Sequence, residues 1–206
     1  SHRLIEEFML LANETVAGHL ESHGMPALYR IHEKPDPLKV MQFEEFVSAF
    51  GFSLGASEGH ITPMHFQKLV DKIRGNPAER PIAFLMLRTM QKARYDPANV
   101  GHFGLAAATY THFTSPIRRL CDLTVDQILE GYWAAGGALK HDEARLNTSW
   151  VDGNPASDVG RPVHGSSIKD VKSLRILMPG VARQATEAAV RSDRAEMEAT
   201  QLKLLR

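Results

Sequence analysis

Cysteine is nearly absent from this chain of 206 residues. The single cysteine, Cys121, excludes a disulfide within the chain and a cysteine-rich zinc site, and it suits a reducing compartment such as the cytoplasm. Net charge is absent too, because 24 lysines and arginines balance 24 aspartates and glutamates. Nucleic-acid-binding proteins usually carry a basic excess, so any such site in this chain needs positive charge that is gathered locally.

Long apolar runs and the common nucleotide-binding signatures are missing as well. No apolar segment reaches the roughly 18 residues of a membrane span, so we expect no membrane association. The chain contains neither GxxxxGK[ST] nor GxGxxG, which removes the P-loop and Rossmann classes. Its composition, 43% hydrophobic and 23% charged, is typical of a globular domain with a real core.

Hydrophobic spacing predicts a predominantly helical α+β fold with a few short strands. Residues 3–24 place apolar side chains, among them Ile5, Phe8 and Val16, on one helical face, which we expect to pack inward. Further helices are predicted over 36–50, over 62–74, and within 77–95, where a dense apolar stretch is expected to be largely buried.

The rest of the chain alternates between extended and helical patterns. Residues 28–32 alternate like a short strand, and the Gly-rich stretch 101–114 is typical of a strand or an extended loop. Pro116 is expected to begin a helix that runs to Trp133, and the tail 173–206 is helix-forming, with Pro179 starting or kinking its helix. Between them, the Gly-, Asn-, Asp- and Ser-rich interval 136–167 is interpreted as a long surface loop.

The stretch YTHFTSPIRRLCDL, residues 110–123, permits two interpretations. Ser115 can cap a helix that starts at Pro116 and leave both arginines facing solvent. Two cations at a helix N-terminus oppose the helix dipole, however, unless an anion compensates. Asp122, at the i,i+4 spacing from Arg118, can supply part of the compensating negative charge. Alternatively, the anion is a bound phosphate that Arg118 clamps at this helix end.

Other candidate groups are also open to a plain structural explanation. Glu6 and Glu7 can form a solvated helix face, or one of them can lie at the core border and accept hydrogen bonds from ribose hydroxyls. His102 and His112 flank the Gly-rich stretch without a carboxylate nearby in sequence, so we expect no histidine metal site.

Four segments together resemble the ribonuclease II / ribonuclease R family of processive 3′→5′ exoribonucleases. HFGLA followed by YTHFTSPIRR and an Asp-Leu pair is similar to the family's hallmark. HRLIEEFMLLAN and LYRIHEKP are similar to the preceding helix and strand, and RAEMEATQLKLL weakly resembles the last catalytic-domain helix. The resemblance covers residues 1–206 as part of a catalytic domain, with 136–167 as an insertion.

The resemblance implies a role for individual residues. Arg118 matches the arginine that contacts the scissile phosphate, Glu6 a carboxylate near the ribose hydroxyls, and Glu196 a carboxylate close to the RNA 3′ end. The other positions that it implies as RNA contacts are Arg30, His32, Tyr110, His112, Thr114 and Arg119.

The family hydrolyses RNA with Mg²⁺ held by clustered aspartates, which precede the first helix matched here. We therefore expect the chain to be the second half of a catalytic domain, without metal ligands of its own and inactive alone. Its expected partners are single-stranded RNA and the remaining domains of a longer cytoplasmic protein.

The sequence also departs from the family pattern. Leu120-Cys121 replaces Tyr followed by Pro or Gly, Asp126-Gln127 replaces a His-Arg pair, and Met197 replaces an arginine. A diverged relative that binds RNA or a partner protein without catalysis therefore remains an alternative, as does a helical domain without a ligand.

Overall fold

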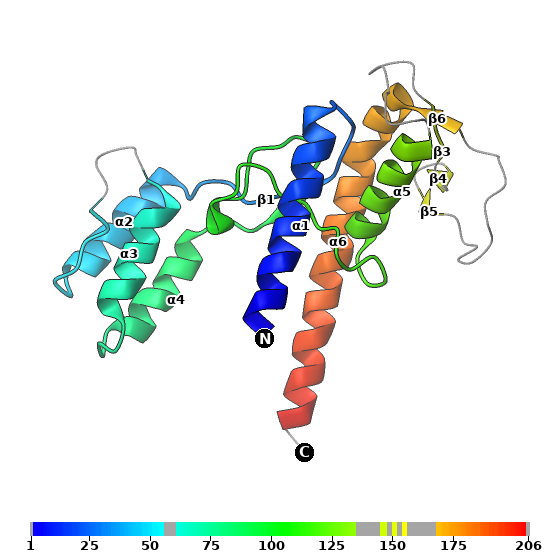
Figure 1. Cartoon of the computed structure of the whole chain (residues 1–206). Coiled ribbons are helices and arrows are strands. Elements are labelled where there is room, and N and C mark those ends of the chain that lie inside the picture. Colours follow the sequence, from blue (N-terminus) through cyan, green and yellow to red (C-terminus); the bar gives the residue numbers. More distant parts are fainter. Residues whose placement is uncertain are drawn as a thin grey trace. The chain divides into compact units, whose positions relative to one another are not determined.

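The computed structural model describes residues 2–55, 61–134, 145–147, 150–151, 154–155 and 168–204 (Figure 1). Helices dominate, as predicted. The α-helices are α1 (His2–Ser22), α2 (Pro37–Ser48), α3 (Pro63–Ile73), α4 (Glu79–Thr89), α5 (Leu120–Ala134) and α6 (Val171–Leu204), with a 3-10 turn η1 (Phe103–Leu105). The strands are β1 (Tyr29–Ile31), β2 (Arg94–Asp96), β3 (Arg145–Asn147), β4 (Trp150–Val151), β5 (Asn154–Pro155) and β6 (Ile168–Asp170). The predicted fold class, α+β with helix predominant, is confirmed.

The chain folds as two compact units. The first unit comprises Ser1–Arg30, Arg94–Asn99 and Thr109–Arg206, and the second comprises Ile31–Ala93 and Val100–Ala108. No helix within the described ranges is both long and apolar enough to cross a lipid bilayer.

In the first unit, α5 packs against α6 (Figure 1), and β2 lies against α6 as well. The C-terminal half of α1 meets α5 where the ring of His19 contacts Tyr132 edge-on. Strands β1 and β2 form a two-stranded sheet, β3 pairs antiparallel with β6, and β4 pairs antiparallel with β5. The side chains at the centre of this unit are fully buried and apolar: Leu20, Leu28, Val125, Ile128 and Leu174.

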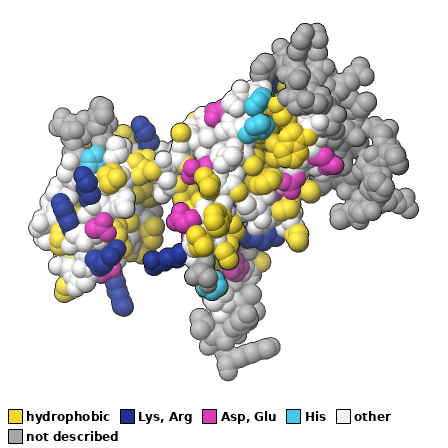
Figure 2. Space-filling model, in the orientation of Figure 1, with side chains coloured by type: hydrophobic (Ala, Val, Ile, Leu, Met, Phe, Trp, Pro, Cys, Tyr) yellow, Lys and Arg dark blue, Asp and Glu magenta, His cyan; other side chains and the backbone are white. Residues whose placement is uncertain are grey.

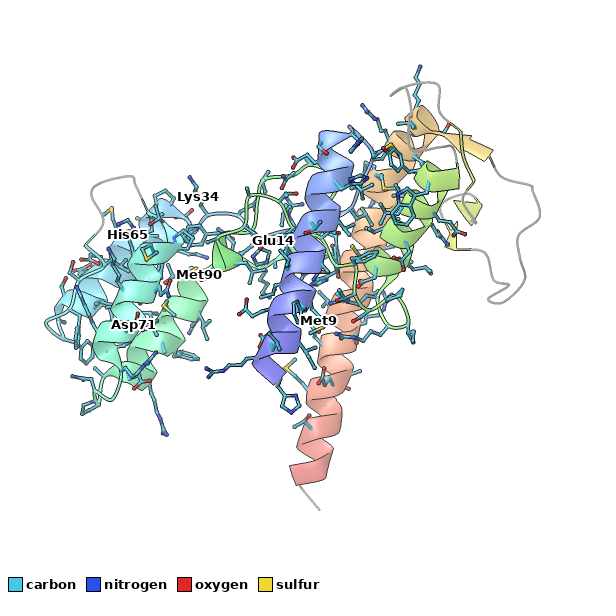
Figure 3. All side chains as sticks on the ribbon, in the orientation of Figure 1. Met9, Glu14, Lys34, His65, Asp71 and Met90 are labelled. Carbon is cyan, nitrogen blue, oxygen red and sulfur yellow. The ribbon has the colours of Figure 1, made fainter. Side chains whose placement is uncertain are left out.

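In the second unit, α2, α3 and α4 enclose a separate core that contains Phe43 stacked on Phe66. The helix starts follow from local chemistry. Asp36 caps α2, because its Oδ1 accepts hydrogen bonds from the N–H groups of Leu38 and Lys39. At α3, the Thr62 N–H donates to Nδ1 of His65, which lies near the start of the helix in Figure 3.

The predicted inward face of α1 is correct only for the second half of the helix. Burial begins at Asn13 and continues at Ala17 and Leu20. In contrast, Ile5 is 57% exposed and Phe8 is 60% exposed. Figure 2 shows hydrophobic side chains gathered over this end of α1. Glu6 lies in the same turn and is exposed, so the expectation that it lies at the border of the core is wrong.

The predicted start of α5 at Pro116 is wrong. The backbone forms a turn after Ser115, whose carbonyl accepts hydrogen bonds from the N–H groups of Arg118 and Arg119, both at 3.3 Å. The helix begins only at Leu120. The N–H of Ser115 donates to the side chain of Asp122 at 2.7 Å.

Three other expectations need correction. The apolar stretch in α4 is not largely buried, because Phe84 is 62% and Leu87 is 69% exposed. The segment 77–95 does not stay helical to its end, since its last residues form β2. Pro179 does not start the last helix, because α6 begins eight residues earlier and includes it.

The interval 136–167, interpreted as one loop, contains strands β3, β4 and β5. Its other residues lie outside the described ones.

Candidate anion-binding site

A pocket of about 200 Å³ in the first unit brings together cationic side chains from distant parts of the sequence. Arg30 comes from β1, His112 from the loop before α5, and Arg118 and Arg119 from the turn that leads into that helix. Helix α6 supplies the opposite wall with small side chains and one acid, Asp193. Because arginines outnumber acids here, the pocket has the positive local charge that the neutral chain lacks overall.

The two adjacent arginines have different surroundings. Arg119 donates to Oδ1 of Asp122 at 2.7 Å, and this carboxylate is fully buried. Arg118 is exposed, lines the pocket, and forms no ion pair with any described residue. The expected Arg118–Asp122 pair is therefore wrong, because the late start of α5 places Arg119 next to the carboxylate instead. Arg118 is left available for an external anion.

Tyr95 connects an arginine and a histidine of the pocket. The Arg30 guanidinium carbon lies 4.8 Å from the centroid of the Tyr95 ring, and the Tyr95 hydroxyl lies 2.7 Å from Nδ1 of His112. Burial raises the pKa of Tyr95 well above its usual value of 10, so the hydroxyl keeps its proton. Tyr95 was not singled out from the sequence, because it follows a helical pattern and its partners lie far away in the chain.

A buried hydrogen-bond network holds the loop that carries His112. The Asn13 side chain donates to the Tyr110 hydroxyl at 2.9 Å, and the Phe113 N–H donates to Asn13 Oδ1 at 3.0 Å. Thr111 donates its hydroxyl proton to the Leu28 carbonyl. Asn13 is therefore a functional support that sequence reasoning missed, although its place on an apolar helix turn was a possible signal.

The other residues that the sequence singled out lie elsewhere. Tyr110 is buried, and Thr114 is half-buried in the same loop. Glu6 is exposed on α1, and Glu196 borders a separate surface hollow on α6. His32 belongs to the second unit, where its Nδ1 accepts a hydrogen bond from the Gly104 N–H at 2.9 Å.

Helix α5 carries Cys121 and Asp126, two positions at which the sequence departs from the pattern of the family that it resembles. Cys121 is fully buried, and burial raises the pKa of its thiol to about 12, which makes a reactive thiolate role implausible. Burial also raises the pKa of Asp126 to about 6, with smaller contributions from the neighbouring charges of Asp122 and Glu130.

A metal site finds no support among the described side chains. His19 and His23 have the i,i+4 spacing of a ligand pair, and their ring centroids lie 4.3 Å apart. However, no group of three His, Cys, Asp or Glu side chains in the described ranges could hold a metal ion. His23 Nδ1 instead lies 2.8 Å from the His19 carbonyl at the end of α1.

The segment GFSLG, residues 51–55, matches the GxSxG pattern of hydrolase nucleophiles. It follows helix α2 and not a strand, which the nucleophile elbow requires. The Ser53 hydroxyl donates to Glu44 at 2.6 Å, and the Leu54 N–H donates to the same carboxylate at 2.8 Å. The serine therefore anchors a loop.

A pocket with an available arginine, a second arginine over an aromatic ring and a histidine has the chemistry to bind an anion. The family model described as the RNB domain matches residues 1–134. The chain belongs to the RNB domain family.

Curated relatives are similar to this part of the chain. Ribonuclease R 1 of Lactococcus lactis subsp. lactis (strain IL1403) is 48% identical over 129 residues, which cover 63% of this chain and 16% of that protein. Ribonuclease R of Aquifex aeolicus (strain VF5) is 49% identical over 130 residues, which cover 63% of this chain and 18% of that protein. The chain thus spans less than a fifth of the length of these relatives.

Two solved structures share the fold. Mycoplasma genitalium RNase R in complex with ribose methylated single-stranded RNA has a TM-score of 0.73 at 24% identity, covering 95% of this chain and 26% of that one. Yeast Ssd1, described as a pseudonuclease, has a TM-score of 0.59 at 26% identity, covering 90% of this chain and 20% of that one.

Proposed function

We propose that this chain is part of a 3′→5′ exoribonuclease that hydrolyses single-stranded RNA processively, and that its cationic pocket holds a phosphate of the RNA backbone. The observation that carries the proposal is the division between the two arginines: Asp122 neutralises Arg119, and Arg118 is left exposed in the pocket. Membership of the RNB domain family and the likeness to an RNase R solved with single-stranded RNA support it.

In this proposal, Arg118 donates two parallel hydrogen bonds to the oxygens of one phosphate. A planar guanidinium matches this geometry, and it stabilises the negative charge that develops on the phosphate during hydrolysis. Arg30 and His112 approach the same pocket from β1 and from the loop. Arg119 then contributes mainly by fixing the turn, because its charge is already compensated by a buried carboxylate.

The magnesium ion that the resemblance implies does not fit the described residues of this chain, because no three suitable ligands lie together among them. We assign no step to a metal here. We expect this chain alone to bind RNA without hydrolysing it, and the longer protein to act in the cytoplasm with Mg²⁺ ligands from outside this chain.

Further RNA contacts are proposed at the remaining positions. Exposed Glu6 is suited to accept a hydrogen bond from a ribose 2′-hydroxyl, which would favour RNA over DNA. Exposed Glu196 is proposed near the RNA 3′ end. Thr114, Tyr110 and His32 stay candidate contacts, with Tyr110 acting through its buried hydrogen bond to Asn13.

The alternative is a relative that binds RNA, or a partner protein, without catalysis. The likeness to Ssd1, a pseudonuclease, favours this alternative. Cys121 and Asp126 on α5, where the sequence departs from the family pattern, favour it too. Neither position lines the pocket, and Arg118, which does, matches the family pattern. The alternative therefore predicts RNA affinity like that of the enzyme, with no turnover in the longer protein.

Binding of a labelled single-stranded RNA to this chain, followed by fluorescence anisotropy, tests the proposal. We expect the affinity to fall as salt is added, because phosphate contacts release counterions. Arg118→Ala should weaken binding about tenfold, whereas Arg74→Ala, which removes an exposed arginine of the second unit, should leave it unchanged. Equal affinity for both variants, or no RNA binding by the parent chain, would contradict the proposal.

A further inference from the structure

Tyr95 is fixed from several sides within the first unit. It is 5% exposed, and its N–H donates to Thr186 Oγ1 at 3.1 Å, which ties β2 to α6. Thr186 is itself held, because its hydroxyl donates to the Ala182 carbonyl at 2.9 Å. The phenol therefore enters the pocket from a rigid support, with little freedom to follow a ligand.

The ring and the hydroxyl of Tyr95 contact two different side chains of the pocket. The face of the ring carries the Arg30 guanidinium at 4.8 Å, a distance at which the ring attracts a cation. The hydroxyl meets Nδ1 of His112 at 2.7 Å, and the two rings lie edge to face with centroids 5.7 Å apart. Both Arg30 and His112 line the phosphate pocket.

The Tyr95 hydroxyl can hold a neutral His112 in one tautomer. When the hydroxyl donates to Nδ1 across the 2.7 Å contact, the imidazole proton resides on Nε2; when it accepts from Nδ1–H, the proton resides on Nδ1. An imidazole with its proton on Nε2 presents a donor from that nitrogen, which is what a phosphate oxygen requires.

We propose that Tyr95 is the positioning residue of this pocket: its ring holds Arg30, and its hydroxyl donates to Nδ1 of His112 and so holds this side chain in the Nε2–H form, which positions both side chains for contact with an RNA phosphate. The part that concerns RNA rests on the proposed function above. The part that concerns the imidazole is a property of the free chain.

The first measurement is the tautomer of His112 in the free chain, from long-range ¹H–¹⁵N NMR spectra, with His112→Asn used to assign the signal. We expect one tautomer, protonated on Nε2, in the parent chain and a mixture of both in Tyr95→Phe. A parent chain with the proton on Nδ1, or a Tyr95→Phe variant with an unchanged tautomer, would overturn the role of the hydroxyl. No RNA is needed, so this result stands apart from the fate of the proposed function.

The second measurement is affinity for the labelled single-stranded RNA. Tyr95→Phe keeps the ring and should weaken binding about three- to tenfold, the worth of one hydrogen bond. Tyr95→Leu also removes the ring beneath Arg30 and should weaken binding several-fold more. Tyr132→Phe removes a buried tyrosine hydroxyl outside the pocket and should bind like the parent.

Thermal unfolding followed by circular dichroism shows whether each variant is folded. If Tyr95→Leu is unfolded, Arg30→Ala takes its place and should give the same further loss relative to Tyr95→Phe. Equal affinity of Tyr95→Phe and Tyr95→Leu, or of Arg30→Ala and the parent, would overturn the role of the ring. Tyr95→Phe affinity within twofold of the parent would overturn the role of the hydroxyl in RNA binding.

Discussion

Replacing Asp122 with Asn tests how the turn before α5 is held. The carboxylate is fully buried, and its Oδ1 accepts hydrogen bonds from the Ser115 N–H and from Arg119, both at 2.7 Å. Its negative charge also lies in the first turn of α5, where the helix dipole favours an anion. One side chain therefore fixes the turn, compensates Arg119 and stabilises the helix start.

The magnitude follows from what Asn keeps and loses. An amide oxygen can still accept the Ser115 N–H, so the substitution removes mainly the negative charge beside Arg119. The Asn amide nitrogen replaces Oδ2, a buried atom that has no hydrogen-bond partner among the residues that the structure describes. Removing one member of a buried ion pair costs about 3–5 kcal/mol. Arg119 is 21% exposed and retains some hydration, so we expect a loss of about 2–4 kcal/mol in the free energy of unfolding.

The assay is urea unfolding of the 206-residue chain at neutral pH. Asp71→Asn is the matched control, because Asp71 pairs with Arg74 at 3.3 Å on the surface, with side chains 59% and 75% exposed. Such a pair is worth less than about 0.5 kcal/mol. If Asp122→Asn and Asp71→Asn had equally small effects, the buried carboxylate would not hold the turn, and the division of roles between Arg118 and Arg119 would lose its basis.

Three further predictions concern single side chains. In the longer protein, Arg118→Lys should keep most of the RNA affinity but cost about 3–4 kcal/mol of transition-state stabilisation, since lysine lacks the two-pronged contact; turnover near the parental rate would contradict this. There too, Glu6→Ala should reduce the preference for RNA over DNA about tenfold or more, whereas Glu7→Ala should not, as competition binding would show. Burial raises the pKa of Asp126 to about 6, so the folded chain holds a proton that the unfolded chain has released, and stability falls as the pH rises from about 4 to 6. Asp126→Asn should therefore add about 1 kcal/mol to the free energy of unfolding at neutral pH, a value reduced because the side chain is only partly buried, and add little at about pH 4; an equal effect at both pH values would refute this.

Where local chemistry decides the structure, the sequence was sufficient. Asp36 and Thr62 each precede a proline and an apolar run, and both helices begin where these residues predict. Ser115 before Pro116 carries the same local signal, yet no helix begins there. Instead, the Ser115 N–H is bound by Asp122 at the start of the next helix, a contact that this local signal does not reveal.

The sequence singled out candidate residues for the site but not their geometry. The resemblance implied that Arg118 contacts phosphate, which stays a prediction, and the structure brings Arg118 together with Arg30, His112 and Arg119 in one pocket. That Arg119 pairs with Asp122 depends on where the helix begins, which spacing alone did not reveal. Tyr95 escaped notice because each of its contacts joins residues that are distant in sequence.

The most direct test of the central claim is digestion of a 5′-labelled single-stranded RNA by the longer protein with Mg²⁺, beside a DNA of the same sequence. The account predicts an RNA ladder that shortens one nucleotide at a time from the 3′ end, intact DNA, and loss of the ladder with Arg118→Ala. Intact RNA, internal cleavage, equal digestion of the DNA, or a ladder unaffected by Arg118→Ala would contradict it.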